Sequence, residues 1–338
     1  MIDGSMGEGG GQILRTSLAL ACITGKRLRI ENIRAARRKP GLARQHLSCV
    51  RAACAICRGR SEGATLGSQR LDFEPGRVRD GDYSFDIGSA GSASLVVQTV
   101  LPALFLAEAP SSVTVTGGTH NPWAPPFDFL AETFLPAIAQ AGFHAECELL
   151  KHGFFPAGGG KLGFEIQPWR RKSGRAIDLC KPPAKPQVHA RIYTARLPAD
   201  IAHRQQELLC HSGLKIASME HIDVQDSDGP GNCAMLRICS AGRTTVFTAF
   251  GQKGKPSKKV IAEVAGHARD YLSSTAAVDS FLADQLLIYM AIAKAGSFTT
   301  NQLSTHLTTN IETIGQFLAV SFRVESRKSN HRIACEPV

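Results

Sequence analysis

The sequence lacks the features of a membrane or secreted protein. No stretch reaches the ~18–20 uncharged apolar residues that a membrane span requires. The first residues, Met1 to Gly11, are rich in glycine and include acidic side chains, without the basic region and apolar segment of a secretory signal. The ten cysteines are scattered over 338 residues, which excludes a dense disulfide framework. We therefore expect a cytoplasmic protein that does not contact membranes.

Common metal and nucleotide motifs are also scarce. Only Cys54 and Cys57 have the C-x-x-C spacing of a metal or redox site, and no second Cys pair or His pair lies near them in the sequence. We interpret the cysteines as small buried apolar residues rather than as ligands. No Gly-Lys-Ser/Thr follows the N-terminal glycines and no strand precedes them, which excludes a Walker A loop and a dinucleotide fingerprint there.

What the sequence does have is the composition of a folded protein with an excess of basic residues. Hydrophobic residues make up 43% and charged residues 20%, which argues against wholesale disorder. Lys and Arg number 39 against 29 Asp and Glu, a net charge of +10. This excess favours a polyanionic partner, although a basic protein without such a partner fits the number equally well. The length exceeds that of one minimal domain.

The predicted elements recur in the same order three times: helix, strand, loop, helix, strand, strand. An apolar helix from Gln12 to Ile23 ends at Gly25, and Gly296 occupies the same step of the third copy. The predicted helices span 12–23, 42–57, 92–107, 127–141, 275–295 and 311–318, and the predicted strands span 28–33, 69–73, 83–87, 112–116, 144–150, 161–166, 297–301, 320–325 and 332–336. Any α/β chain alternates, but the shared glycine step and the strand pair that ends each copy favour a true repeat.

A segment of different pattern separates the second and third copies. It opens at the proline-rich junction Lys181–Pro186, which can continue neither a helix nor a central strand. Within it we predict strands over 188–194, 234–239 and 244–249 and helices over 199–211 and 257–272. The predicted fold is therefore α/β, with a large domain of three repeats (residues 1–182 and 273–338) and an inserted small α/β domain (residues 183–272).

A glycine-rich loop, Gly7–Gln12, leads directly into the first helix. Glycines without a Cβ let the backbone approach a ligand closely, and a helix N-terminus attracts phosphate oxygens. Glu8 would repel an anion unless a divalent cation bridged the two, so it is a candidate metal-associated carboxylate. A solvated acid at the helix N-terminus fits its position as well. Arg15 lies one turn into the helix, where its side chain can reach back toward the loop.

Five basic residues and no acidic residue occupy positions 34–44: Arg34, Arg37, Arg38, Lys39 and Arg44. Such a segment is either the footprint of a polyanion or a solvated face, and we favour the footprint. Gln45 and His46 continue the segment at the start of the second helix.

Further loops of small residues stand before other elements. Gly88–Ser92 precedes the helix that contains Gln98, and Gly117–Pro126 precedes the helix after it. The glycine loop His152–Gly160 precedes a strand, where a bulge or tight turn is its expected role.

His306 lies among small polar residues at the entry to a predicted helix. That position is suited to presenting an imidazole to phosphate, but a lone histidine is more often structural. Asp284 and Gln285, on the preceding helix, are candidates to orient or activate His306 through its other ring nitrogen.

Together these motifs closely resemble those of the RNA 3′-terminal phosphate cyclases. The resemblance rests on Gly7–Arg15, Lys39–His46, Gly88–Ser92, Gly117–Pro122, His152–Gly160, Gly229–Asn232, Leu282–Leu286 and Thr305–Leu307, which follow the family's order. It implies a large domain of three repeats, each with two helices on a four-stranded sheet, and a smaller domain inserted in the third repeat. This fold is similar to the enolpyruvyl transferases and to the C-terminal domain of translation initiation factor 3.

The resemblance implies ATP-dependent conversion of an RNA 3′-terminal phosphate into a 2′,3′-cyclic phosphate. In the implied reaction a histidine attacks the α-phosphate of ATP, which gives an enzyme–AMP phosphoramidate and pyrophosphate. AMP then passes to the RNA 3′-phosphate, and the neighbouring 2′-hydroxyl expels it. The implied cofactors are ATP and a divalent cation, Mg²⁺ or Mn²⁺, and the implied partner is RNA with a 3′-terminal phosphate. No obligate protein partner is inferred.

The resemblance also assigns roles by position. His306 would be the nucleophile, Glu8 would hold the divalent cation, and Arg15 would contact phosphate. The remainder of the ATP site would comprise Gln98, Pro125, Phe281, Asp284 and Gln285, with Phe281 and Pro125 as the two faces of an adenine sandwich. The phosphate or RNA-end site would comprise Arg34, Arg37, Lys39, Arg44, Gln45 and His46. For Phe281, which lies on an amphipathic helix, packing in the core is the alternative.

Two departures and two competing functions accompany the resemblance. Met6 replaces a more usual polar residue before the glycine loop, and Lys258–Lys259 stand where the family often has an acid. The cyclase-like ribosome-assembly proteins share the fold but lack the catalytic histidine, so His306 favours the enzyme. An enolpyruvyl-transferase-like function is disfavoured by Thr305–Leu307 and Lys39–Leu42.

Overall fold

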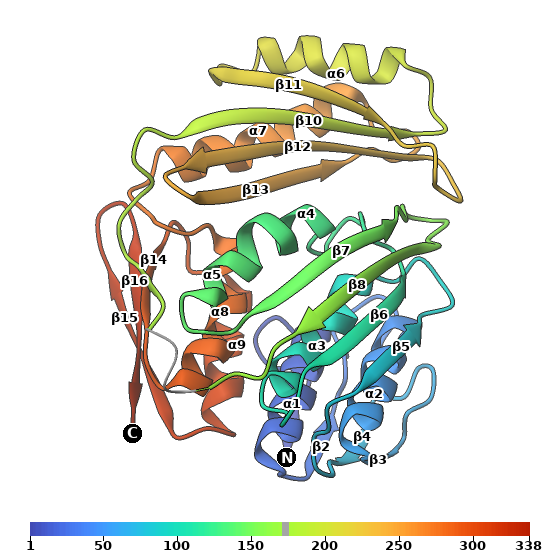
Figure 1. Cartoon of the computed structure of the whole chain (residues 1–338), viewed down its shortest axis with the longest axis vertical. Helices are drawn as coiled ribbons and strands as arrows, with labels where there is room; N and C mark the ends of the chain where they lie inside the picture. Colours follow the sequence, from blue (N-terminus) through green and yellow to red (C-terminus); the bar gives the residue numbers. More distant parts are fainter. Residues whose placement is uncertain (171–175) are drawn as a thin grey trace.

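The computed structural model describes residues 1–170 and 176–338, which form four four-stranded sheets with helices against them (Figure 1). In three sheets the strand order, numbered along the chain within each sheet, is first, second, fourth, third, and the first two strands are parallel. The recurring order confirms an α/β fold of three repeated units. The fourth sheet has another order, second, first, third, fourth.

The three repeats have the following elements. The first comprises β1 (Ile2–Asp3), α1 (Gly11–Thr24), β2 (Leu28–Glu31), α2 (Arg44–Cys57), β3 (Arg60–Glu62) and β4 (Leu71–Glu74). The second comprises β5 (Asp82–Asp86), α3 (Ala93–Leu104), β6 (Ser111–Gly117), α4 (Phe127–Phe129), the π-helical turn η1 (Leu130–Phe134), α5 (Leu135–Ala139), β7 (Ala145–Lys151) and β8 (Gly160–Ile166). The third comprises β9 (Asp178–Leu179), α8 (Ser280–Ala293), β14 (Ser297–Thr300), α9 (Thr305–Gly315), β15 (Val320–Ser326) and β16 (His331–Pro337).

The fourth sheet and its helices lie in the chain between β9 and α8. They comprise β10 (Gln187–Ala195), α6 (Asp200–Cys210), β11 (Ile216–Asp223), β12 (Gly231–Ser240), β13 (Arg243–Phe250) and α7 (Ser257–Leu272). Since β9 pairs with β14, these elements interrupt the third repeat after its first strand. We call residues 183–272 the insert.

One of the predicted strands was assigned to the wrong repeat, and β3 and β11 were not predicted. The strand predicted over 83–87 to end the first repeat is β5, which pairs in parallel with β6 and begins the second sheet. The strand that pairs with β4 in its place is β3, a short polar segment without alternation of apolar residues. Strands β1 and β9 have two residues each, too few for a periodic pattern. An alternating pattern identifies a strand but does not name its partner.

Both helices of the third repeat begin at positions other than those predicted. Helix α8 begins at Ser280 rather than 275, because the Asp279 carboxylate accepts hydrogen bonds from the N–H groups of Phe281 and Leu282. Helix α9 begins at Thr305 rather than 311, where the Ser304 hydroxyl accepts from the N–H of Leu307. His306 therefore lies in the first turn of a helix and not in a loop.

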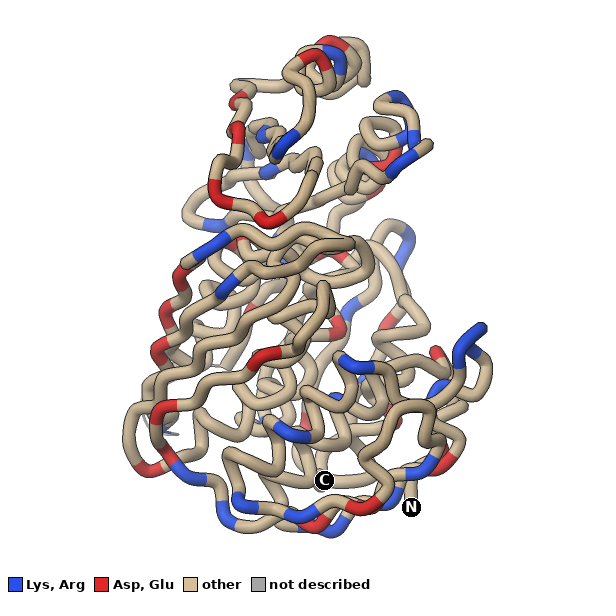
Figure 2. The backbone as a smooth tube through the Cα atoms, turned by 90° about the vertical axis from the view of Figure 1, so that its right-hand side faces the viewer, with Lys and Arg blue, Asp and Glu red and all other residues tan. Residues whose placement is uncertain are grey.

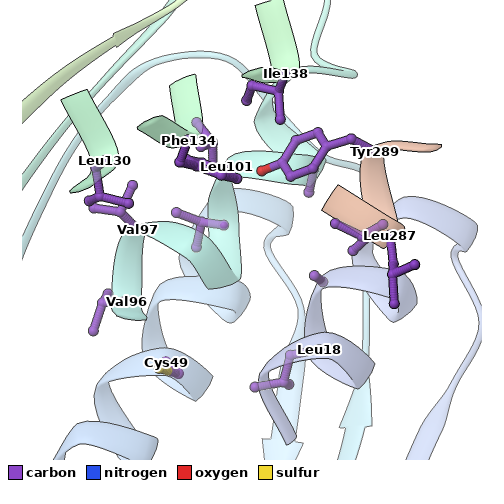
Figure 3. Packing of buried hydrophobic residues seen from close by; sticks show 14 of the residues in the cluster. Leu18, Cys49, Val96, Val97, Leu101, Leu130, Phe134, Ile138, Leu287 and Tyr289 are labelled. Atoms are coloured by element: carbon purple, nitrogen blue, oxygen red, sulfur yellow. The ribbon is translucent and has the colours of Figure 1, made fainter. Parts of the chain in front are cut away.

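The helices of the three repeats pack on one another to form a common core. Helix α1 contacts α2, α3 and α9, and it has buried residues on all sides. Figure 3 shows buried apolar side chains from α1, α3, η1 and α8 in one cluster, among them Leu18, Val97, Leu101, Phe134 and Leu287. Tyr289 meets the ring of Phe134 edge to face, with centroids 5.5 Å apart. This central helix pack holds the N-terminal ends of α1, α8 and α9 near one another.

The sheet of the insert is apolar on both faces. One face packs with α6 and α7 around a cluster of its own, which includes Ile192, Leu236 and Val264. The other face, with Tyr193, Met235 and others, joins the core of the repeats. Strand β13 contacts α4 and η1 and lies lowest in the insert in Figure 1, so it faces the repeats.

The cysteines only partly match their interpretation as buried apolar residues. All ten are free, and five are buried: Cys22, Cys49, Cys57, Cys233 and Cys335. Cys210 is exposed, contrary to that interpretation, because it lies on the outer side of α6. Among the described residues, no group of three or more His, Cys, Asp or Glu side chains could hold a metal ion.

Charged residues are distributed over the whole chain. Figure 2 shows Lys and Arg interspersed with Asp and Glu in both the insert and the repeats. Within the described part of the chain, no helix has the length and apolar character needed to cross a membrane.

Candidate active site

A cavity of about 1060 Å³ lies between the helices of the repeats and the insert. Its walls come from α1, α3, α8, the start of α9 and the loop 122–126, together with β13 and α7 of the insert. Among the sequence-predicted residues, seven line this cavity: Arg15, Gln98, Pro125, Phe281, Asp284, Gln285 and His306. The tertiary structure therefore brings together residues from all three repeats.

Gln12 links His306 to Asp284. The Gln12 side-chain N–H donates to Asp284 Oδ2 at 2.6 Å, and its Oε1 lies 2.8 Å from His306 Nδ1. Because the amide oxygen can only accept, Nδ1 carries the proton and Nε2 keeps a free lone pair. The hydrogen-bonded path from Asp284 to His306 therefore runs through Gln12. Gln12 belongs to the glycine-loop motif, but no local signal in the sequence distinguishes it as a bridge.

The environment of His306 keeps its imidazole neutral. Burial, together with the positive charges of Arg15 and Arg37, lowers the pKa of His306 below 6.5. Burial raises the pKa of Asp284 to about 7, although the Arg15 charge opposes the rise. In either protonation state Asp284 keeps an oxygen that accepts from Gln12. The neutral imidazole with a free Nε2 is the form required of a nucleophile.

Glu8 lies beside His306 and has spare coordinating capacity. Its Oε1 is 3.9 Å from His306 Nε2 and forms an ion pair with Arg37, while its N–H donates to the Thr309 hydroxyl at 3.0 Å. Glu8 Oε2 is buried without a hydrogen-bond partner among the described residues. A Cβ at Gly10 would stand 2.2 Å from this carboxylate, so the loop approaches Glu8 because position 10 has no side chain.

Arg15 and His46 lie together under the glycine loop. A Cβ at Gly11 would meet His46 Nε2 at 2.4 Å and Arg15 Nη1 at 2.8 Å, so both side chains fill the space that glycine leaves open. His46 Nδ1 accepts from the N–H of Ala43 at 3.0 Å, which places its proton on Nε2. Burial, and then the charges of Arg15 and Arg34, lower the pKa of His46 to about 3. His46 is therefore a neutral donor.

The apolar part of the cavity contains Phe281 and Pro125. The Phe281 ring is 48% exposed, which contradicts the alternative that it packs in the core. Gln285 donates to the Phe281 carbonyl at 2.7 Å and accepts from Gln98. The Pro125 carbonyl accepts from the Ser94 hydroxyl at 2.6 Å. Hydrogen bonds to the backbone carbonyls of Phe281 and Pro125 thus fix the positions of these two rings.

The basic segment borders the cavity without lining it. Arg37 reaches Glu8, but Arg34 donates to the Gly41 carbonyl at 2.7 Å, which holds its own loop. Gln45 accepts from the Ser92 N–H at 2.8 Å, and Arg44 contacts the Gly88 carbonyl at 3.5 Å. Lys39 is exposed. Gln45 therefore positions the glycine loop 88–92, a role its place in the sequence does not indicate.

The insert contributes a wall of the cavity that the sequence interpretation did not include. Phe247 and Lys255 line it from the β13 side, and His267 lines it from α7. The His267 ring meets Phe281 edge to face, with centroids 5.4 Å apart. Trp123, in the loop 122–126, also lines the cavity and was not among the predicted site residues.

Comparison with known proteins gives consistent matches over nearly the whole chain. Residues 6–324 match a family model described as RNA 3′-terminal phosphate cyclase. The chain is 47% identical over 335 residues to the RNA 3′-terminal phosphate cyclase of Koribacter versatilis (strain Ellin345), covering 99% of this chain and 94% of that protein. It is 46% identical over 327 residues to the protein of the same name from Ralstonia nicotianae (strain ATCC BAA-1114 / GMI1000), covering 97% and 94%.

Proposed function

Because the chain belongs to the RNA 3′-terminal phosphate cyclase family, we propose that it uses ATP to convert an RNA 3′-terminal phosphate into a 2′,3′-cyclic phosphate. The observation that carries this proposal is the hydrogen-bonded chain from Asp284 through Gln12 to His306, which leaves Nε2 free in a cavity that borders a basic segment. Family membership and the neutral His306 imidazole with a free Nε2 both support nucleotidyl transfer.

His306 Nε2 attacks the α-phosphorus of ATP, a P–N bond forms, and the bond to the pyrophosphate oxygen breaks. Positive charge that develops on the imidazole is stabilised by the hydrogen bond from Nδ1–H to Gln12. An oxygen of the RNA 3′-phosphate then attacks the same phosphorus and releases His306. Finally the 2′-hydroxyl attacks the activated 3′-phosphorus, loses its proton, and expels AMP.

Glu8 fits the role of a ligand for a divalent cation. One oxygen of its carboxylate is buried without a hydrogen-bond partner among the described residues. Since the described residues contain no dense cluster of metal ligands, the ion would be held mainly by phosphate oxygens. When bound, Mg²⁺ or Mn²⁺ would neutralise charge on the triphosphate. Arg15 and Arg37 flank Glu8 and His306 and contribute positive charge to the same region.

The apolar side of the cavity suits the adenine base. Phe281 offers an exposed ring and Pro125 a rigid apolar surface in the same cavity, and base stacking on such platforms contributes about 1–3 kcal/mol. The β- and γ-phosphates would then lie toward the basic segment, because Glu8 lies beside His306 and pairs with Arg37 of that segment. Arg34, Lys39 and Arg44 are proposed to attract the RNA end to this side, and the neutral His46 is proposed to donate a hydrogen bond there.

The proposal extends to the organisation and location of the protein. The unit of residues 183–272 is an inserted domain within a three-repeat domain of residues 1–182 and 273–338, of which 171–175 lie outside the described residues. Its separate strand order and its own apolar cluster support this division. The protein acts in the cytoplasm, and it requires no protein partner for the reaction.

The first test is formation of the protein–AMP adduct. Incubation with α-labelled ATP and Mg²⁺ or Mn²⁺ is expected to label the protein through an acid-labile, alkali-stable bond. His306→Ala is expected to abolish labelling, and Gln12→Ala to slow it about 10–100-fold, as the loss of an orienting partner does. His203→Ala, at an exposed histidine of α6, serves as the control. Labelling that persists in His306→Ala would sink the mechanism.

A companion assay tests the RNA reaction. An RNA with a 3′-phosphate is expected to become phosphatase-resistant in the presence of ATP, whereas an RNA with a 3′-hydroxyl stays unchanged. A protein that binds RNA but forms neither adduct nor cyclic end would instead be a non-catalytic, cyclase-like assembly factor.

A further inference from the structure

Trp123 presents an aromatic ring to solvent at the catalytic cavity. Its residue is 89% exposed although it lines the cavity that contains His306. Its φ of 62° is the left-handed conformation that large side chains rarely adopt. The other tryptophan, Trp169, is instead stacked on Phe143 with centroids 4.8 Å apart. A large apolar ring that is held out of the core beside a reactive site is placed for a ligand.

The loop that carries Trp123 is anchored on both sides of the ring. On one side the buried Asn121 donates to the Ala90 carbonyl at 2.6 Å. On the other side the Pro125 carbonyl accepts from Ser94 at 2.6 Å. Prolines 122, 125 and 126 limit the backbone further. The exposure of Trp123 therefore results from a fixed loop conformation.

The basic segment 34–44 contacts the same loop that anchors Asn121. In loop 88–92, the Ala90 carbonyl accepts a hydrogen bond from Asn121. The same loop is hydrogen-bonded to Arg44 and Gln45 at the start of α2. The aromatic ring and the basic segment 34–44 are thus connected through one short loop. Positive charge along a path with aromatic rings beside it is the pattern by which proteins bind single-stranded nucleic acid.

We propose that Trp123 stacks on a base near the 3′ end of the RNA and that the strand leaves the cavity past loop 88–92 toward Arg44. This inference rests on the proposed function. A nucleoside triphosphate can lie wholly inside the cavity, but an RNA chain must leave through its mouth, where only an exposed residue can meet it. The ATP base already has Phe281 and Pro125 within the cavity. Trp123 thus contributes to recognition of the strand and not to the chemistry at His306.

Steady-state kinetics on a single-stranded RNA with a 3′-phosphate test this role. Trp123→Ala is expected to raise the KM for RNA about tenfold with kcat within about twofold, and Trp123→Phe is expected to restore most of the loss because it keeps a stacking ring. The effect is expected to vanish on an RNA with abasic sites at its last positions. Val324→Ala, at an exposed apolar residue of β15, is the matched control. An unchanged KM in Trp123→Ala overturns the inference.

Fluorescence gives a test that does not depend on catalysis. Because Trp169 is stacked and its Nε1 is hydrogen-bonded to the Ala141 carbonyl, a ligand-induced change is expected to arise from Trp123. Addition of the 3′-phosphorylated RNA is expected to quench emission in wild type and not in Trp123→Phe. Quenching by ATP alone, with slower adduct formation in Trp123→Ala, would assign the ring to the nucleotide site and overturn the inference. RNA quenching without any adduct would refute the proposed function while the binding role stands.

Discussion

At the residue scale, the charges around His306 determine when its imidazole can act. Burial lowers its pKa first, and Arg15 and Arg37 lower it further. The attacking form is the neutral imidazole, so adduct formation increases as pH rises through the pKa of the folded protein. Since that pKa lies below 6.5, the proposed nucleophile is available throughout the neutral range.

Arg37→Gln is expected to shift the acid limb of adduct formation to higher pH. The substitution removes a positive charge from the neighbourhood of His306, and it leaves the Glu8 carboxylate, 3.9 Å from Nε2, without its ion pair. Both changes favour the protonated imidazole and raise its pKa. The rate of labelling by α-labelled ATP between pH 5 and 8 measures the shift. Arg38→Gln, at the exposed next residue, is the control; equal profiles for the two variants would contradict this account.

At the element scale, the basic segment depends on a glycine pair that joins two loops. Gly41 and Gly67 have nearly the same positive φ, 78° and 77°. A Cβ at Gly41 would lie 2.1 Å from the Gly67 carbonyl oxygen, whereas no described atom lies within 4 Å of a Cβ at Gly67. Because Arg34 donates to the Gly41 carbonyl, a displacement of Gly41 would also disturb the position of Arg34 in the basic segment.

The glycine pair separates backbone strain from steric overlap. Gly67→Ala is expected to cost about 1–2 kcal/mol of stability through its left-handed backbone alone. Gly41→Ala is expected to cost about 1–3 kcal/mol more, because a backbone carbonyl has to move. Chemical denaturation of both variants measures the difference. If the two variants unfold at the same denaturant concentration, the overlap is relieved without cost and the contact is unimportant.

Helix α9 shows why local pattern located some elements and misplaced others. Its apolar periodicity begins late, so the sequence predicted its start at Ile311, but the Ser304 cap begins it at Thr305. Strand β3 was missed because it is short and polar, and it exists only because β4 offers it hydrogen bonds. Long apolar helices such as α1 were predicted within one residue at each end, since their own residues determine them.

At the scale of the whole molecule, a buried polar network fastens the insert to the second repeat. Asp128 of α4 accepts hydrogen bonds from Tyr193 at 2.7 Å and Arg191 at 3.1 Å, both on β10, and lies 2.9 Å from His120 Nε2. Burial alone would raise the pKa of Asp128, but His120, Tyr193 and Arg191 together lower it to about 2. The carboxylate thus stays charged, and its stabilising effect is lost only as pH falls below about 4 toward that value.

Asp128→Asn is expected to destabilise the protein by about 3–5 kcal/mol, because Arg191 loses its most buried carboxylate partner. Glu220→Gln removes the most exposed carboxylate partner of the same arginine, which is 58% exposed, and is expected to cost less than about 1 kcal/mol. Thermal or chemical unfolding at pH 7 compares them. A similar loss in both variants would show that the buried network does not hold the insert. Since β13 and α7 line the cavity, adduct formation reports whether that wall has moved.

The sequence by itself determined the periodic elements, the order of the repeats and the glycine loops, because these depend on neighbours within a few positions of the chain. Only the tertiary structure decided that β5 starts the second sheet, that Gln12 stands between Asp284 and His306, and that the insert closes one side of the cavity. Gln12 and Asp284 are 272 positions apart, and Gln12 and His306 are 294 apart. Contacts of that kind arise from packing of whole helices, and no local pattern of residues encodes them.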